Sequence, residues 1–118
     1  MAYVEIMVTP VPKGKIAAYK ALAKVSAKVW KKHGATSYAE SIADNVKPGK
    51  VTSFPQSVKM KKNETVATCV ITFKSKAHHD AVWKKVMKDP FMVNFDMKKA
   101  PFDGKRMYFG GFKTVASY

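Results

Sequence analysis

The segment PFDGKRMYFGGF near the end of the chain gathers side chains that could bind an anion or a carbonyl group. Arg106 is the only arginine among 22 basic residues, and Tyr108 follows it on the same face of a predicted strand. A guanidinium binds a carboxylate through two parallel hydrogen bonds, and a phenol donates one more. The alternative is structural: Arg106 pairs with Asp103, beside Gly104, and only fixes the loop.

Two glutamates, Glu5 and Glu40, lie inside predicted strands, where carboxylates are uncommon. If they point toward the sheet face that no helix covers, they line a cavity. Otherwise they face water at an edge or pair with a lysine of a neighbouring strand. Both arrangements stay open on sequence grounds.

The histidines and the single cysteine carry weaker signals. His33 ends a predicted helix, where it is either a tunable acid–base group or a histidine that stabilises the negative end of the helix dipole. His78 and His79 are neighbours on a helix and point about 100° apart, so they are poor partners for one metal ion. We therefore expect no metal and no cofactor. Cys69 lies among apolar residues and is expected to be an inert buried thiol.

The net charge of +14 comes almost entirely from lysine. Lysine without arginine gives a diffuse positive field rather than a base-reading or phosphate-clamping surface. A phosphate-binding GxxxxGK[ST] loop is also missing from the sequence. Nucleic acid is therefore a possible but secondary partner, and any binding should be weak and salt-dependent.

The elements that must position these residues follow from hydrophobic periodicity. Alternating or apolar runs predict four strands, and apolar stripes at helical spacing predict two long helices. In chain order the elements are a strand over 3–9, a helix over 15–33, strands over 36–42 and 65–73, a helix from the cap Ser75 to Lys88, and a strand over 106–112. Residues 44–63 form a long, partly packed connection, and 101–104 form a loop.

This order predicts a single α+β domain over residues 1–118 with a ferredoxin-like β-α-β-β-α-β topology: a four-stranded antiparallel sheet with both helices on one face. We expect the aliphatic face of Val4, Ile6 and Val8 to meet the helices, which places Glu5 on the other face, where it could pair with Arg106. That second face is too apolar for water, so a second copy of the chain should cover it.

Composition bounds the location of the protein. No apolar run approaches the ~18 residues of a membrane span, and no basic segment followed by an apolar stretch opens the chain. A lone cysteine suits a reducing compartment. We expect a cytoplasmic protein without a membrane partner.

Five segments together resemble the YbaA-like proteins, an uncharacterised bacterial family with a domain of unknown function; they are VTPVPKGKIAAYK, VWKKHGATSYAES, DNVKPGKVTSFP, KVMKDP and PFDGKRMYFGGF. The resemblance covers almost the whole chain. It implies a dimeric α-β barrel, a superfamily that also holds cofactor-free monooxygenases and haem-degrading enzymes. No catalytic motif of those enzymes aligns here, so the resemblance supports the fold and leaves the activity open.

Three functions remain. The first is a homodimer that binds a small molecule in a cavity on the sheet face, with a cofactor-free monooxygenase or isomerase as the enzymatic version. The second is a lysine-driven module for polyanions or nucleic acid, and the third is a structural or regulatory dimer. The candidate ligand-binding residues are Glu5, Glu40, Arg106, Tyr108, Asp103 and His33.

Overall fold

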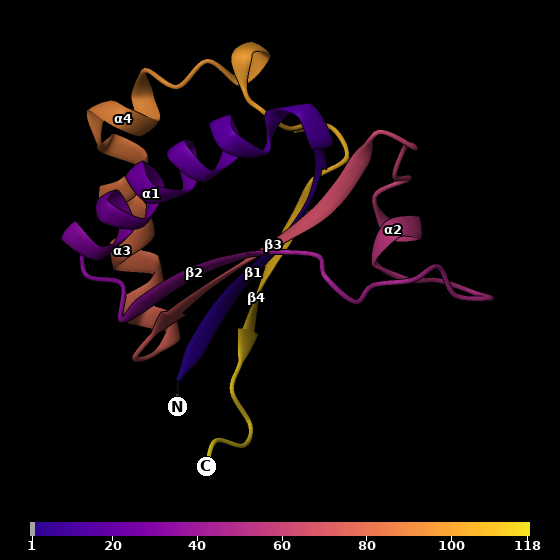
Figure 1. Cartoon of the computed structure of the whole chain (residues 1–118). Helices are drawn as coiled ribbons and strands as arrows, with labels where there is room; N and C mark the ends of the chain where they lie inside the picture. Colours follow the sequence, from indigo (N-terminus) through magenta and orange to yellow (C-terminus); the bar gives the residue numbers. More distant parts are fainter. Residues whose placement is uncertain (1) are drawn as a thin grey trace.

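The sheet is built around two ten-residue strands, β1 (Tyr3–Pro12) and β3 (Glu64–Phe73), which pair antiparallel along their full length. The computed structural model describes residues 2–118. β2 (Ser37–Ile42) joins the outer edge of β3, and β4 (Tyr108–Lys113) joins the outer edge of β1, in the order β2-β3-β1-β4 (Figure 1). The predicted ferredoxin-like fold is confirmed, and its first and third strands lie at the centre of the sheet.

Two long helices, α1 (Ile16–Lys32) and α3 (Lys76–Lys88), lie against one face of the sheet (Figure 1). A 3-10 turn, η1 (Lys13–Lys15), leads into α1. α1 contains no acid, so no ion pair forms within the helix and the packing of its buried stripe stabilises it. Its stripe includes Trp30, which meets Trp83 of α3 at 5.6 Å between ring centroids.

Three short elements complete the chain: α2 (Phe54–Ser57), α4 (Pro90–Val93) and the 3-10 turn η2 (Met97–Lys99). α2 lies on the side of the sheet opposite the long helices (Figure 1). The loop that carries it is only partly packed, as predicted: Val58 is buried against Val8 and Val66, whereas Val51 is exposed. Within residues 2–118, no helix combines the length and apolar character needed to cross a membrane.

The first strand is longer than predicted because two prolines do not end it. Pro10 and Pro12 pair with Val66 and Glu64 of β3. The pairing of β1 with β4 stops at Val8, so the missing amide hydrogens of the prolines interrupt no second ladder. β4 in turn begins two residues later than predicted, since Arg106 is held in the preceding turn by a bond from its amide to the Asp103 carbonyl.

The predicted assignment of the sheet faces is wrong. Glu5 and Met7 pair with Ile71 and Cys69, which are buried beneath the helices, so these β1 residues face the helices too. The helices cover the face of β3 that carries the buried side chains of Cys69, Ile71 and Phe73. Two exposed apolar side chains on the opposite, open face are Val70 and Phe112.

Candidate functional site

A cavity of about 310 Å³ lies between the sheet and the helices. This space differs from the cavity predicted on the uncovered face between two copies of the chain, which stays a prediction. Its walls come from the sheet, from both long helices and from the segment 91–107 that follows α3. The lining residues are Met7, Thr9, Tyr19, Leu22, Ser26, Trp30, Tyr38, Glu40, Cys69, Trp83, Met87, Phe91, Met92, Phe95, Met97, Phe102, Met107 and Phe109.

Most of these walls are aromatic rings and methionine thioethers. Five of the seven methionines of the chain and both of its tryptophans line this one space. Unbranched thioether side chains adapt to ligands of varied shape, and aromatic rings supply large apolar area. The cavity is therefore suited to a mostly apolar guest.

Glu40 is the only acid on the cavity wall. The Tyr38 hydroxyl, two residues away on the same strand face, donates to Glu40 Oε2 at 2.6 Å. The Tyr19 hydroxyl of α1 donates to Oε1. Ser26, seven residues after Tyr19 on the same side of α1, lies 3.0 Å from the Tyr38 oxygen and completes the cluster.

The donors around Glu40 are neutral at ordinary pH. Burial, together with the neighbouring Glu40 carboxylate, raises the pKa of Tyr19 above its usual value. Burial is likewise the main cause that raises the pKa of Tyr38. Within residues 2–118, no lysine, arginine or histidine forms an ion pair with Glu40. The carboxylate thus meets the cavity with hydrogen bonds but without a counter-ion.

The thiol beside this cluster is not a nucleophile. Cys69 pairs with Glu40 across the strands and is 3% exposed. Burial raises the pKa of the Cys69 thiol to about 12, so it stays protonated. The prediction of an inert buried thiol agrees with this environment.

Glu5 is buried beneath the helices and does not line the cavity. Its Oε1 lies 2.7 Å from His79 Nε2, and the other ring nitrogen of His79 lies 2.9 Å from Asp80 Oδ1. The predicted pair of Glu5 with Arg106 does not form, because Glu5 pairs with His79 of α3 instead. This pairing compensates Oε1 of the buried carboxylate, whereas Glu5 Oε2 has no hydrogen-bond partner among the described residues.

Arg106 forms a clamp with protein groups instead. Its Nη1 and Nη2 donate to the two oxygens of Glu64 at 2.8 and 2.6 Å, and its Nε donates to Asp103 at 2.8 Å. Nη1 also reaches the carbonyls of Val58 and Lys59. The bonds to Arg106 lower the pKa of both carboxyls. This geometry favours the structural alternative over an anion site.

The two remaining candidates also lie away from the cavity. The Tyr108 hydroxyl donates to Ser57 Oγ at 2.8 Å on the open side of the sheet. His33 follows α1 and places Nε2 2.8 Å from Asp89 Oδ2, while Asp89 Oδ1 accepts from the Phe91 amide and caps α4. The His33 bond is the main cause that lowers the pKa of Asp89 to about 2. Both arrangements are structural contacts.

Sequence reasoning therefore found Glu40 but missed its partners. Tyr38 and Glu40 alternate on one strand face, and Tyr19 and Ser26 are polar breaks spaced seven residues apart in the apolar stripe of α1. Polar residues that interrupt the apolar faces of two elements packed together were the sequence signal that could have identified the partners of Glu40.

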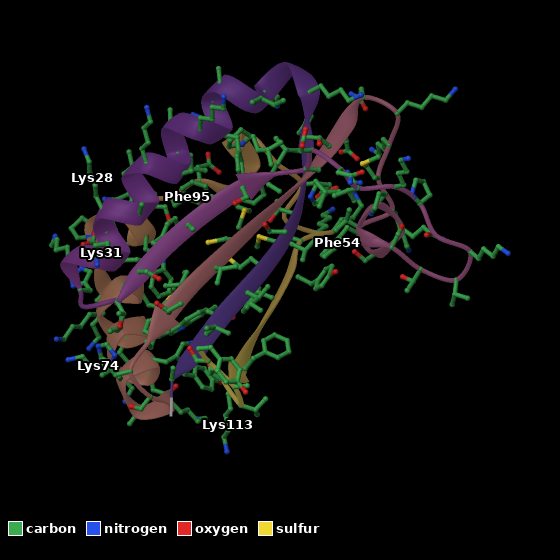
Figure 2. All side chains as sticks on the ribbon, turned by 60° about the horizontal axis from the view of Figure 1, so that its bottom comes forward. Lys28, Lys31, Phe54, Lys74, Phe95 and Lys113 are labelled. Atoms are coloured by element: carbon green, nitrogen blue, oxygen red, sulfur yellow. The ribbon has the colours of Figure 1, made fainter. Side chains whose placement is uncertain are left out.

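The lysines form no comparable site. Figure 2 shows Lys28 and Lys31 extending from α1, with Lys74 and Lys113 elsewhere on the outside of the molecule. Lys32 pairs with Asp89, and Lys31 donates to the Thr36 carbonyl. Polyanion binding remains a prediction from composition.

Comparisons with known proteins match the chain to proteins of unknown function and to a solved structure of similar fold. A family model described as "Protein of unknown function (DUF1428)" matches residues 2–104. The uncharacterized protein YbaA of Escherichia coli K12 is 42% identical over 115 residues, which cover 98% of this chain and 97% of that protein. The Shigella flexneri protein of the same name matches equally. A dimeric ferredoxin-like protein from an uncultured marine organism covers 100% of both chains with a TM-score of 0.53 and 13% identity, a likeness of fold.

Proposed function

The chain belongs to the DUF1428 family of proteins of unknown function, and we propose that it binds a small, mostly apolar molecule in the cavity beneath α1 and α3. One observation carries the proposal: Glu40, a carboxylate without a counter-ion, faces an otherwise apolar space. The ligand places a hydrogen-bond donor, an N–H or O–H group, against Glu40.

The energetics of the cluster support this role. A carboxylate withdrawn from water is costly unless charge-assisted hydrogen bonds or an opposite charge compensate it. Tyr19 and Tyr38 supply one donor to each oxygen of Glu40, while a carboxylate accepts about four. Acceptor capacity therefore remains for a guest. Few polar groups within apolar walls are the usual composition of a small-molecule site.

The experiment uses N-phenyl-2-naphthylamine, a neutral dye with one N–H group that fluoresces in apolar surroundings. We expect saturable binding with energy transfer from Trp30 and Trp83, which line the cavity. Glu40→Gln keeps the shape but removes the charge, so we expect about fivefold weaker binding. The control Asp44→Asn changes an exposed acid and should bind the dye as the parent does. Equal binding by Glu40→Gln would contradict the proposal.

A narrower, enzymatic function rests on the same carboxylate. A carboxylate in an apolar cavity is placed to take a proton from a C–H bond beside a ligand carbonyl, the step that an isomerase or a cofactor-free monooxygenase needs first. We expect the protein to speed hydrogen–deuterium exchange into 2-tetralone in D₂O, followed by NMR. Glu40→Gln should abolish the acceleration. If 2-tetralone binds but the protein does not speed its exchange, the enzymatic function is wrong and only the binding function is retained.

We also infer that two copies pair through the open sheet face, the arrangement expected of a dimeric α-β barrel. Val70 and Phe112 lie exposed on that face, and the ferredoxin-like structural neighbour is described as dimeric. Sedimentation should give a dimer at micromolar concentration. Val70→Lys should shift it toward monomer, whereas Val115→Lys, outside the sheet, should not. A parent protein that sediments as a monomer would overturn the inference.

A further inference from the structure

A second hollow lies on the outer side of the cavity wall. It is an open groove of about 720 Å³ between the first turns of α1 and the segment 90–101. Lys15 and Ala18 form its helix side, and Asp96 and Lys99 lie on the opposite side. The cavity wall has one charged side chain, Glu40, whereas the groove is bordered by charged side chains of both signs.

One layer of side chains separates the groove from the cavity. Leu22, Phe91 and Phe95 line both hollows. Ala18 and Leu22 of α1 face the groove together with Lys15, the last residue of η1, while Tyr19, which binds Glu40, lies on the adjoining face of α1. A molecule that passes between these shared side chains occupies both hollows at once.

The two hollows carry opposite electrostatic preferences. Among residues 2–118, neither Lys15 nor Lys99 forms an ion pair. Asp96, the acid of the groove, accepts a bond from the Lys98 amide at 3.0 Å through Oδ1. Two lysines against one acid leave the groove with a net positive charge, so an anion is attracted to the groove and repelled from the cavity by Glu40. This polarity orients a ligand that carries a charge at one end.

We propose that the ligand is an organic acid that spans both hollows, with its carboxylate, sulfonate or phosphate between Lys15 and Lys99 and its apolar body inside the cavity. This rests on the proposed function, because it requires the same cavity and the same donor toward Glu40. The ligand enters between Leu22 and the two phenylalanines. The lysines then determine which apolar molecules are held: acids over neutral or cationic compounds of the same shape.

The test compares two dyes that share the same aromatic ring system and differ in charge. N-phenyl-2-naphthylamine is neutral, and 2-anilinonaphthalene-6-sulfonate adds an anion at the end remote from its N–H. We expect the sulfonate to bind more tightly, and added salt to weaken the sulfonate alone. In the double variant Lys15→Met/Lys99→Met, the affinity for the sulfonate should fall about tenfold, while that for the neutral dye stays within about twofold.

Lys28→Met is the matched control, because it removes a lysine from α1 away from the groove. It should leave both affinities unchanged. If the double variant binds the sulfonate as the parent does, or if Lys28→Met weakens it equally, the organic-acid inference fails. The proposed function fails separately, if the neutral dye shows no energy transfer from the tryptophans or ignores Glu40→Gln.

Discussion

Two glutamates on neighbouring strands have contrasting environments. Glu64, at the start of β3, is 4% exposed and is matched by the fork of Arg106. Glu40, in the middle of β2, receives only neutral phenols and faces a cavity. A carboxylate whose charge is fully matched stabilises the fold, whereas one left unmatched retains the capacity to bind something else. The clamp is thus structural, and the cavity is the candidate site.

The largest expected effect tests the structural half of this comparison. Arg106→Met strands Glu64 without its partner and should lower the free energy of unfolding by about 3 kcal/mol in urea denaturation. The neighbouring Lys105→Met removes an exposed charge and should change it by no more than about 0.5 kcal/mol. Equal effects would mean that the clamp contributes no more than surface charge does.

The pH dependence of stability tests the pairing of Glu64 with Arg106 independently. Arg106 lowers the pKa of Glu64 below the usual 4.5, so the ionised carboxylate stabilises the folded state above that pH. As the pH falls through the lowered pKa, this stabilisation is lost. The difference in unfolding free energy between the parent and Glu64→Gln should therefore shrink as the pH drops below 4.5. A difference that stays constant down to acid-induced unfolding would contradict the assignment.

The smallest expected effect concerns Glu40. Glu40→Gln removes a half-buried charge that has no counter-ion and keeps the volume, so the free energy of unfolding should change by about 1 kcal/mol or less, in either direction. The measurement is again urea denaturation, beside the dye binding of the same variant. If Glu40→Gln lowers the free energy of unfolding as much as Arg106→Met does, then Glu40 has a structural role and does not differ from Glu64.

The fold could be predicted because its signals are local. The alternation of β1, the apolar run of β3 and the apolar stripes of the helices indicated the order of elements, from which the ferredoxin-like topology gave the strand order. The resemblance to the YbaA-like proteins agreed with the family. The face assignment failed because β1 has apolar residues on both sides. His79, the partner that draws Glu5 beneath the helices, lies 74 residues away. Periodicity within one strand contains no information about such a partner.

The site was predictable only in part for the same reason. Glu40 was recognised as an unusual strand residue, but the Tyr19 hydroxyl comes from 21 residues earlier and the fork of Arg106 meets Glu64 across 42 residues. Turn chemistry suggested the nearby Asp103, which Arg106 does bind. The carboxylate of Glu64 occupies the guanidinium of Arg106. This contact could not be predicted without knowing how the strands pair in the folded sheet.

The concentration of methionine around the cavity has a spectroscopic consequence. A protein labelled with ¹³C at the methionine methyl groups has seven such groups, and five of them border this one space. Met60 lies outside it and provides an internal reference. A guest that brings an aromatic ring into the cavity will shift several of the five resonances through its ring current while Met60 stays in place. The chain thus carries its own reporters for screening compounds whose identity is not known beforehand.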